Sequence, residues 1–296
     1  MTEREEVRLR KEADPFSKPW TRDPILRRYK FTNVRRHHDR TSSELIDLFY
    51  DDHQDSPKKE ILMNCALARY FGTYEFMEAV GWQSFDDFDF EGIKETARLR
   101  LESKPRQRVF TGAYVITNQG ISAPKQEVVV DYFLRPLHAK AEEICTIVEE
   151  TSKWEEVSIA MRKIPGFGGS GFMTKETLLD TTYTNFWKDT DTDHIPGNEV
   201  KSIPFDWNSW TPIGPGARRG LARLSGKDVP GNGLKVSEAD MNFLICEIAA
   251  SQDLHWNKDK YGVLSPTDIQ FQLCEFDKYE RVRLGQGRLR SKYKGI

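Results

Sequence analysis

The fold prediction starts from residues 161–185, MRKIPGFGGSGFMTKETLLDTTYTN. Just before and into this stretch, residues 154–164 carry apolar side chains at helical spacing, which predicts a helix. Pro165 lacks a backbone N–H and Gly166 tolerates a positive φ, so both are expected to end that helix. Thr174 suits the N-cap of a second helix whose buried side carries two leucines. The stretch is therefore predicted to form a helix, a tight turn and a helix.

The turn Ile-Pro-Gly-Phe-Gly resembles that of the helix-hairpin-helix motif of DNA glycosylases, where exposed backbone N–H groups hold a DNA phosphate. The resemblance implies DNA binding by five consecutive residues: Pro165, Gly166, Phe167, Gly168 and Gly169. An ordinary corner between two helices has the same pattern. The turn alone does not separate the two interpretations.

Composition limits the class of protein. The 296 residues can bury a sizeable core in one large or two small domains, and 38% hydrophobic with 30% charged residues is typical of a soluble globular protein. No apolar run reaches membrane-spanning length, and the N-terminus MTEREEVRLRKEAD is too charged for a secretory signal, so a cytoplasmic protein is expected. The four scattered cysteines predict free thiols rather than an iron–sulfur cluster, and neither cysteines nor histidines show metal spacing.

Charge is distributed unevenly along the chain, although the net charge is only −2. Residues 22–40 hold seven basic residues against Asp23 and Asp39, and residues 278–294 hold seven against Glu280. Segregated basic charge is typical of a face that meets a polyanion. A solvated surface with ordinary ion pairs gives the same pattern.

Helical patterns dominate, which predicts a mainly α fold with few short strands. Residues 110–117 are rich in β-formers and leave open a hairpin strand or an irregular, aromatic-lined segment. Residues 1–19 are predicted to be a flexible N-terminal arm, residues 20–280 a single helical catalytic domain with room for two lobes, and residues 281–296 a basic tail. Helix starts are predicted at five capping pairs: Asp23 with Pro24, Thr41 with Glu44, Ser56 with Pro57, Ser237 with Asp240, and Ser265 with Pro266.

Residues 214–220, GPGARRG, form the second distinctive segment. Gly214 and Gly216 free the backbone to approach a ligand, and Arg218 and Arg219 lie where a helix is expected to begin. Backbone N–H groups and guanidinium forks suit phosphate oxygens. The sequence contains no Walker motif, so ATP hydrolysis and kinase activity are not expected. A plain turn with two surface arginines is the alternative.

Two further segments carry residues suited to substrate contact. Asn33, Arg36 and Arg40 are at helical spacing and are expected to share a face that reads a base edge or clamps a phosphate. Glu275 lies on the last predicted helix, where it suits a general base or the binding of an ammonium group. A solvated helix surface is the alternative for both segments.

Four segments occur in this order along the chain: residues 28–41, 164–168, 214–221 and 273–276. Together they resemble the α-glutamyl/putrescinyl thymine pyrophosphorylase family, the phage amino acid:DNA transferases, and are similar to the helical domain of 5-hydroxymethyluracil DNA kinases. The resemblance covers roughly residues 20–292 and implies a helix-hairpin-helix, DNA-glycosylase-like helical fold. It also implies a role in thymidine hypermodification by a bacteriophage, in the cytoplasm of the host cell.

The family chemistry implied by this resemblance is the displacement of pyrophosphate by an amine. A 5-hydroxymethyluracil DNA kinase, to which the chain would be functionally coupled, first makes 5-pyrophosphomethyl-deoxyuridine in double-stranded DNA. The amine of a free amino acid then displaces the pyrophosphate, once the base has been flipped out of the stack. Glycine is the amino acid that the family suggests, and the sequence itself does not fix it. No cofactor is expected, and a Mg2+ on the pyrophosphate is compatible with the acidic residues present.

Roles follow from the resemblance and from what the reaction demands. The leaving pyrophosphate needs cations and N–H donors, and the amine must lose a proton to a general base. Pyrophosphate and substrate binding is assigned to Asn33, Arg36, Arg40, Gly214, Gly216, Arg218 and Arg219. The candidate general bases are Asp39, Asp180 and Glu275.

Two alternatives remain open at the level of sequence. One is a DNA glycosylase that excises a modified base. Residues 189–194 weakly resemble the stretch that carries the catalytic Asp in glycosylases, and Asp191 is the residue to substitute as a test. A non-catalytic helix-hairpin-helix DNA-binding protein is the other.

Overall fold

The computed structural model describes residues 1–226, 236–287, 289 and 292–293. The chain divides into two units, each described by itself below. Unit 1 combines Met1–Asp39 with Asn208–Ile296, and unit 2 is Arg40–Trp207. Residues 20–280, expected to form one helical domain with room for two lobes, include parts of both units. In the described part of the chain, no helix is long and apolar enough to cross a membrane.

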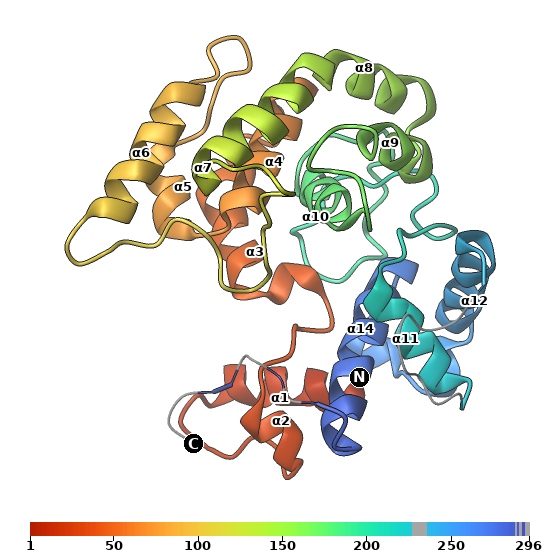
Figure 1. The fold of residues 1–296 in the computed structure, drawn as a ribbon. Helices are drawn as coiled ribbons and strands as arrows, with labels where there is room; N and C mark the ends of the chain where they lie inside the picture. Colours follow the sequence, from red (N-terminus) through yellow and green to blue (C-terminus); the bar gives the residue numbers. More distant parts are fainter. Residues whose placement is uncertain (227–235, 288, 290–291, 294–296) are drawn as a thin grey trace. The chain divides into compact units, whose positions relative to one another are not determined.

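Unit 2 is built around helix α4, Lys58–Phe71, in which every residue from Ile61 to Phe71 is buried (Figure 1). Such an all-round buried helix is typical of the centre of a helical unit. Gly72, with a φ of 64°, ends it in the left-handed conformation. Helices α8 and α10 pack against α4. The other helical elements of unit 2 are α3 (Arg40–Leu45), η2 (Ile46–Tyr50), α5 (Tyr74–Val80), α6 (Phe90–Glu102), α7 (Lys125–Glu127), η3 (Val128–Leu134), α8 (Arg135–Thr151), α9 (Trp154–Met161), α10 (Phe172–Asp180) and η4 (Thr181–Tyr183).

The predicted helix, turn and helix is present as α9, residues 162–171 and α10. Helix α10 begins after Gly171, whose φ is 67°, and not after Thr174 as predicted. The Thr174 hydroxyl instead donates to the Phe167 carbonyl at 2.7 Å, tying α10 to the turn. Gly166 has a φ of 88°, and a Cβ there would lie 2.4 Å from Cγ of Phe133. The turn is therefore packed against the core of unit 2 and held to its second helix.

Unit 1 has a core formed by residues from both of its chain segments. Its helical elements are α1 (Thr2–Ala13), α2 (Pro24–Arg28), η1 (Arg36–His38), α11 (Pro215–Leu224), α12 (Glu238–Ala250), η5 (Gln252–Leu254), α13 (Lys258–Tyr261) and α14 (Pro266–Arg283). Its buried apolar cluster comprises Val34, Ile213, Ala217, Leu221, Met241, Ile245, Ala249, Trp256, Leu264, Ile269 and Leu273. Three of the five helix starts predicted from capping pairs are confirmed, with Asp23, Ser237 and Ser265 each accepting a backbone N–H. The other two, both in unit 2, are wrong in the capping residue. Helix α3 begins at Arg40, before Thr41, and the N-cap of α4 is Pro57, without a side-chain hydrogen bond.

Helices α11 and α14 pack closely because two glycines face α14. A Cβ on Gly216 would lie 2.8 Å from Sγ of Cys274, and a Cβ on Gly220 would lie 2.3 Å from the carbonyl oxygen of Leu273. Small residues at a helix crossing let the backbones approach. This close packing makes α14 the central helix of unit 1.

The structure corrects the expectation for the N-terminal end of the chain and covers only part of the C-terminal end. The loose arm expected for residues 1–19 is helical over Thr2–Ala13, where Glu5 is buried and Arg8 pairs with Glu5 and Glu12 across helix turns. The basic tail expected at residues 281–296 begins inside α14, which runs to Arg283. Residues 288, 290–291 and 294–296 of that tail lie outside the described residues.

In the part of the chain that the structure describes, the expected short strands do not form. In the described ranges, β structure is limited to the isolated antiparallel bridges Tyr29–Lys292 and Asp189–Ile203. The β-rich residues 110–117 are an irregular, aromatic-lined segment. The ring of Phe110 stacks on Phe71 at 5.2 Å, and the Tyr114 hydroxyl donates to the Arg69 carbonyl. Aromatic packing, and not a strand partner, uses the bulky side chains there.

Candidate functional site in unit 1

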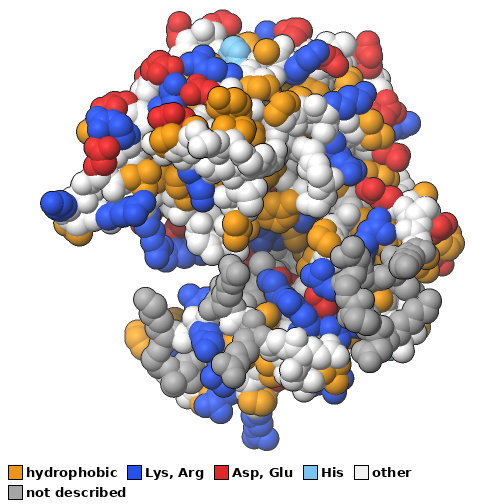
Figure 2. Space-filling model, viewed as in Figure 1, with side chains coloured by type: hydrophobic (Ala, Val, Ile, Leu, Met, Phe, Trp, Pro, Cys, Tyr) orange, Lys and Arg blue, Asp and Glu red, His pale blue; other side chains and the backbone are white. Residues whose placement is uncertain are grey.

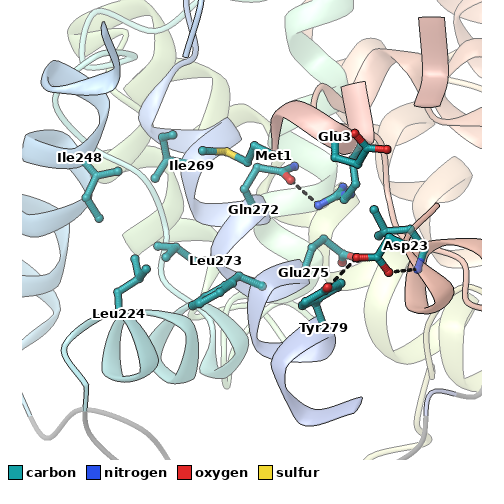
Figure 3. Close-up of a pocket in the computed structure, with 13 residues that line it drawn as sticks. Met1, Glu3, Asp23, Leu224, Ile248, Ile269, Gln272, Leu273, Glu275 and Tyr279 are labelled. Atoms are coloured by element: carbon teal, nitrogen blue, oxygen red, sulfur yellow. Dashed lines mark hydrogen bonds between the residues drawn. The ribbon is translucent and has the colours of Figure 1, made fainter. Parts of the chain in front are cut away.

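A cavity of about 370 Å³ lies within unit 1, between residues of α1, α2, α11, α12 and α14. Figure 3 shows Leu224, Ile248, Ile269 and Leu273 on one side of it and the polar ends of Asp23, Gln272, Glu275 and Tyr279 on another. A largely apolar cavity with a few convergent polar groups is the usual form of a small-molecule site. The complete lining is Met1, Glu3, Arg4, Asp23, Leu26, Leu224, Ile248, Ile269, Gln272, Leu273, Glu275, Phe276 and Tyr279.

Asp23 caps a helix with one carboxylate oxygen and binds a tyrosine hydroxyl with the other. Its Oδ1 accepts the N–H groups of Ile25 at 2.8 Å and Leu26 at 3.0 Å, which caps α2. Its Oδ2 accepts the Tyr279 hydroxyl at 2.6 Å. The hydrogen bond to Asp23 raises the pKa of Tyr279 to about 12.

Glu275 is buried on α14, with 4% of its side chain exposed, and faces the same cavity. One carboxylate oxygen pairs with Nζ of Lys278 at 2.6 Å, and the other accepts the N–H of Thr32 at 3.2 Å. Gln272 lies one turn earlier and donates to the Asn33 and Val34 carbonyls at 3.2 and 3.1 Å. Gln272 and Glu275 thus hold the segment after α2 against α14.

Arg4 of α1 supplies the cavity with a guanidinium group. It donates to Oε1 of Gln272 at 2.5 Å and to the Thr32 carbonyl. Burial lowers the pKa of Arg4, and the nearby Glu275 and Asp39 carboxylates offset part of that effect. A partly desolvated guanidinium with donors left over is suited to an anionic group on a ligand.

Asn33, Arg36 and Arg40 do not share a helical face, because the backbone between them is not a continuous helix. Arg35 and Asp39 are both extended, on either side of the three-residue η1. Asp39 accepts the Asn33 N–H at 2.7 Å and pairs with Arg36, whose guanidinium also lies 4.8 Å above the Phe271 ring. The side chains of Asp39 and Arg36 therefore shape this loop of unit 1.

Arg40 belongs to unit 2, where it begins α3. Its side chain is 85% exposed and bonds Oε1 of Glu44 at 2.7 Å. The exposed pair contributes little to stability.

The segment 214–220 is the start of α11 and not an open loop. Gly214 is its N-cap with an ordinary φ of −89°, and Gly216 packs against α14. Arg219 is committed to Asp277, a buried carboxylate that it meets at 2.7 Å and that also binds Arg223 at 2.9 Å. Arg218 donates to the Val236 carbonyl and pairs with no carboxylate in the described part of the chain. The expected freedom of the Gly-Pro-Gly backbone is thus used for helix packing.

A basic surface lies beside the cavity, on and around α2. It consists of four exposed cations without a carboxylate partner among the described residues: Arg22, Arg27, Arg28 and Lys30. The one acid in their midst, Asp23, is turned to the α2 N-terminus and Tyr279. Figure 2 shows Lys and Arg side chains on the part of the molecule that carries α2. Such a surface suits the phosphates of a nucleic acid.

In unit 2, the hairpin turn offers a second place for a phosphate. Pro165 and Gly169 are exposed, whereas Gly166 and Phe167 are buried. Within the described residues, the N–H groups of Gly168, Gly169 and Ser170 donate to no protein atom. Adjacent free N–H groups in a turn form an anion-binding concavity. Lys163 is exposed next to them.

Asp180 of unit 2 is fully buried and bound on both oxygens. Arg69 of α4 meets both oxygens, at 2.6 Å on Oδ2, and the Tyr50 hydroxyl donates to Oδ2 at 2.8 Å. Burial alone would lower the pKa of Arg69, but the adjacent Asp180 carboxylate raises it well above its ordinary value. This cluster joins α10 to α4 and has no open side toward a substrate, so it is a structural anchor in this conformation.

Of the residues that line the cavity, Glu275 was predicted from the sequence as a site residue. Arg4, Asp23 and Tyr279 were not. Asp23 carried a signal, since it was identified as a helix cap. Arg4 carried none, because it reaches Gln272 across 268 positions of sequence.

Comparison with known proteins identifies the class. The family model of the 5-hmdU DNA kinase, helical domain, matches residues 1–288, so the chain belongs to the family of that helical domain. Among curated proteins, the chain is similar to the 5-hmdU DNA kinase of Bacillus phage SP10, with 27% identity over 236 residues. The match covers 75% of this chain and 34% of the phage protein, so the chain spans about a third of that relative's length. No solved structure matches the chain.

Proposed function

We propose that this chain is a DNA-modifying transferase of phage thymidine hypermodification. It lets the amine of an amino acid displace pyrophosphate from 5-pyrophosphomethyl-deoxyuridine in duplex DNA. The observation that carries the proposal is the family match over residues 1–288 in a sequence that contains no Walker motif. A helical relative of a DNA kinase without that motif fits the step that follows phosphorylation.

The reaction forms one bond and breaks one. The amine nitrogen bonds to the C5 methylene, the bond from that methylene to the pyrophosphate oxygen breaks, and the ammonium proton passes to a base. Glu275 is the proposed base because it lines the cavity, whereas Asp180 is sealed against Arg69. Arg218 is the proposed partner of the leaving pyrophosphate, since Arg219 is committed to Asp277. A Mg2+ on the pyrophosphate remains compatible with this scheme.

Duplex DNA is proposed to bind through phosphates on both units. In unit 1 the partners are the exposed cations of α2 and its flanks, such as Arg27 and Arg28. In unit 2 they are the free N–H groups of residues 168–170, as in a helix-hairpin-helix motif of a glycosylase-like fold. The described unit 1 cavity beside the α2 cations supports chemistry on a base next to bound phosphates.

The proposal is tested with duplex DNA that carries 5-pyrophosphomethyl-deoxyuridine, incubated with the protein and a mixture of free amino acids. The expected result is released pyrophosphate together with a new aminomethyl-linked nucleoside, detected by mass spectrometry after digestion. Glu275→Gln is the control and is expected to slow product formation by about 100-fold, the usual contribution of a general base. A protein that binds the DNA but yields neither product refutes the transferase.

A non-catalytic DNA-binding domain is the second candidate, favoured by the match to only 34% of a kinase. In that case the chain would present DNA to a separate kinase. The same assay identifies it by binding without chemistry, and it identifies a glycosylase by abasic sites that disappear in Asp191→Asn.

A further inference from the structure

Two of the charges that line the unit 1 cavity have no ionic partner in the described part of the chain. Glu3 and Glu275 are paired with Arg10 at 3.4 Å and Lys278 at 2.6 Å. Arg4 and Asp23, in contrast, form no ion pair and have only neutral hydrogen-bond partners. Besides the α-amino group of Met1, whose pKa burial lowers to about 6, the cavity thus presents one guanidinium and one carboxylate that form no ion pair within the described residues.

Both groups retain hydrogen-bonding capacity toward a ligand. A guanidinium has five N–H donors, and Arg4 uses two of them, on Gln272 and Thr32. A carboxylate has about four lone-pair sites, and Asp23 uses three, on Ile25, Leu26 and Tyr279. A molecule with an anionic and a cationic group can satisfy both at once.

One side of the cavity is apolar. Leu224, Ile248, Ile269 and Leu273 form a wall opposite the polar groups (Figure 3). Filling such a wall with a hydrocarbon side chain contributes about 0.8 kcal/mol per buried CH2 in transfer experiments. A ligand without a side chain leaves this wall unused.

We infer that the cavity binds a free α-amino acid as its zwitterion. Arg4 takes the α-carboxylate, Asp23 takes the ammonium group, and the apolar wall takes an aliphatic side chain. The inference rests on the proposed function for its biological use, because it names the nucleophile's subsite. It also replaces the expected glycine by an amino acid of leucine's class, since glycine cannot occupy the apolar wall.

The test measures binding to the 296-residue protein without DNA, by calorimetry. The ligands are leucine, glycine, 4-methylpentanoate, which lacks the amine, and isoamylamine, which lacks the carboxylate. Leucine is expected to bind with a Kd of about 1 mM or tighter, and the other three at least about tenfold more weakly. Absence of saturable leucine binding, or equal binding of isoamylamine, overturns the inference.

Two variants separate the charged contacts. Asp23→Asn keeps the α2 cap, since Asn is as good an N-cap as Asp, and is expected to reduce leucine affinity to that of 4-methylpentanoate. Arg4→Met is expected to reduce it to that of isoamylamine. Unchanged leucine affinity in both variants contradicts the assignment.

A third variant tests the cavity without touching its charges. Leu224→Trp adds bulk at a lining position that is 55% exposed and is expected to block leucine binding with little change in melting temperature. Leu254→Trp, at a 76% exposed position of unit 1 outside the lining, is the matched control and is expected to bind normally. Loss of binding in both, or in neither, contradicts the site.

The outcomes distinguish this inference from the proposed function. Leucine binding that depends on Arg4 and Asp23, in a protein that releases no pyrophosphate, refutes the transferase and keeps the amino acid site. Amine transfer with an unchanged KM for the amino acid in Arg4→Met refutes the site and keeps the transferase.

Discussion

The glycine-rich segments at residues 165–171 and 214–220 look alike in sequence and are used differently in the fold. In the hairpin of unit 2, Gly166, Gly169 and Gly171 have positive φ values and form a turn with free N–H groups. In unit 1, Gly216 and Gly220 have ordinary helical backbone and lie against α14. The first segment uses glycine for backbone conformation, and the second uses it for close packing.

The helix that each segment leads into, α10 or α11, is also held by an arginine–aspartate contact, again in different ways. In unit 2, Arg69 and Asp180 are 2% and 0% exposed and satisfy one another inside the core. In unit 1, Asp277 is buried but its partner Arg219 is 27% exposed. The comparison teaches that phosphate-binding composition alone does not locate a phosphate site. What decides is whether N–H groups and cations are left without protein partners.

The largest effect is expected for Arg69→Met, which leaves the Asp180 carboxylate buried and unpaired. Removing one partner of a buried ion pair typically costs 3–5 kcal/mol, so we expect about 3–5 kcal/mol less unfolding free energy in urea titrations. Arg98→Met, which removes an exposed arginine paired with Glu95 and Glu102 on α6, is the control and is expected to unfold like the wild type. Equal midpoints for the two variants would mean that the anchor carries no stability.

Next is Gly166→Ala, which combines a positive φ with a Cβ 2.4 Å from Phe133. Left-handed strain and overpacking together predict a loss of about 3 kcal/mol. Gly169→Ala has a similar φ of 63° but open space around its Cβ, so only the strain of about 1 kcal/mol is expected. A difference near zero between these two variants, measured by urea unfolding, would show that the turn is not packed as described.

In the other segment, Gly220→Ala places a Cβ 2.3 Å from the Leu273 carbonyl oxygen and forces α11 away from α14. The expected cost is about 2 kcal/mol, seen as a lower melting temperature. Gly214→Ala is the matched control, because its Cβ meets nothing nearer than Nε2 of Gln270 at 4.0 Å. If Gly214→Ala proved as costly as Gly220→Ala, the packing role of the second segment would be refuted.

Substitution of Gly166 or Gly168 in the hairpin is a poor test of DNA binding, because both glycines also pack against the protein. Gly166 and Gly168 are predicted DNA contacts, yet Gly166 packs on Phe133 and a Cβ on Gly168 would lie 2.8 Å from the Arg162 carbonyl oxygen. Substituting either perturbs the fold first. An exposed side chain beside the turn gives the cleaner test.

Several local features of the fold were predictable from the sequence because their partners lie close in the chain, although α3 and α4 do not begin at the expected caps, Thr41 and Ser56. Asp23, Ser237 and Ser265 cap helices within three residues of themselves, and Pro residues follow two of them. The hairpin itself was predicted from apolar spacing and the Pro-Gly break. The exact start of α10 was not, because Gly171 and the Thr174 bond to Phe167 depend on how the turn closes.

Long-range features were not predictable. The helical face proposed for Asn33 and Arg36 fails because Asp39 bonds the Asn33 N–H and makes a loop instead. Equally, a glycine that faces α14 at Gly220 is indistinguishable in sequence from one that frees a ligand loop. Such roles depend on contacts made across the whole chain, which spacing within one segment does not encode.

The smallest effect, and the one that bears on function, is expected for Lys163→Ala. Lys163 is exposed beside the free N–H groups of residues 168–170 and forms no ion pair in the part of the chain that the structure describes. If the turn holds a DNA phosphate, removing this cation weakens duplex binding about equally for all sequences and reduces the salt-dependence slope by about 0.9. Fluorescence anisotropy at several salt concentrations measures both the affinity and the slope.

The control is Lys140→Ala. Lys140 already pairs with Glu143 at 2.7 Å on α8, so this variant is expected to leave the slope unchanged. Equal slopes for the wild type and both variants would mean that the hairpin turn binds no DNA phosphate. Its glycines would then serve the fold alone, as the glycines of α11 do.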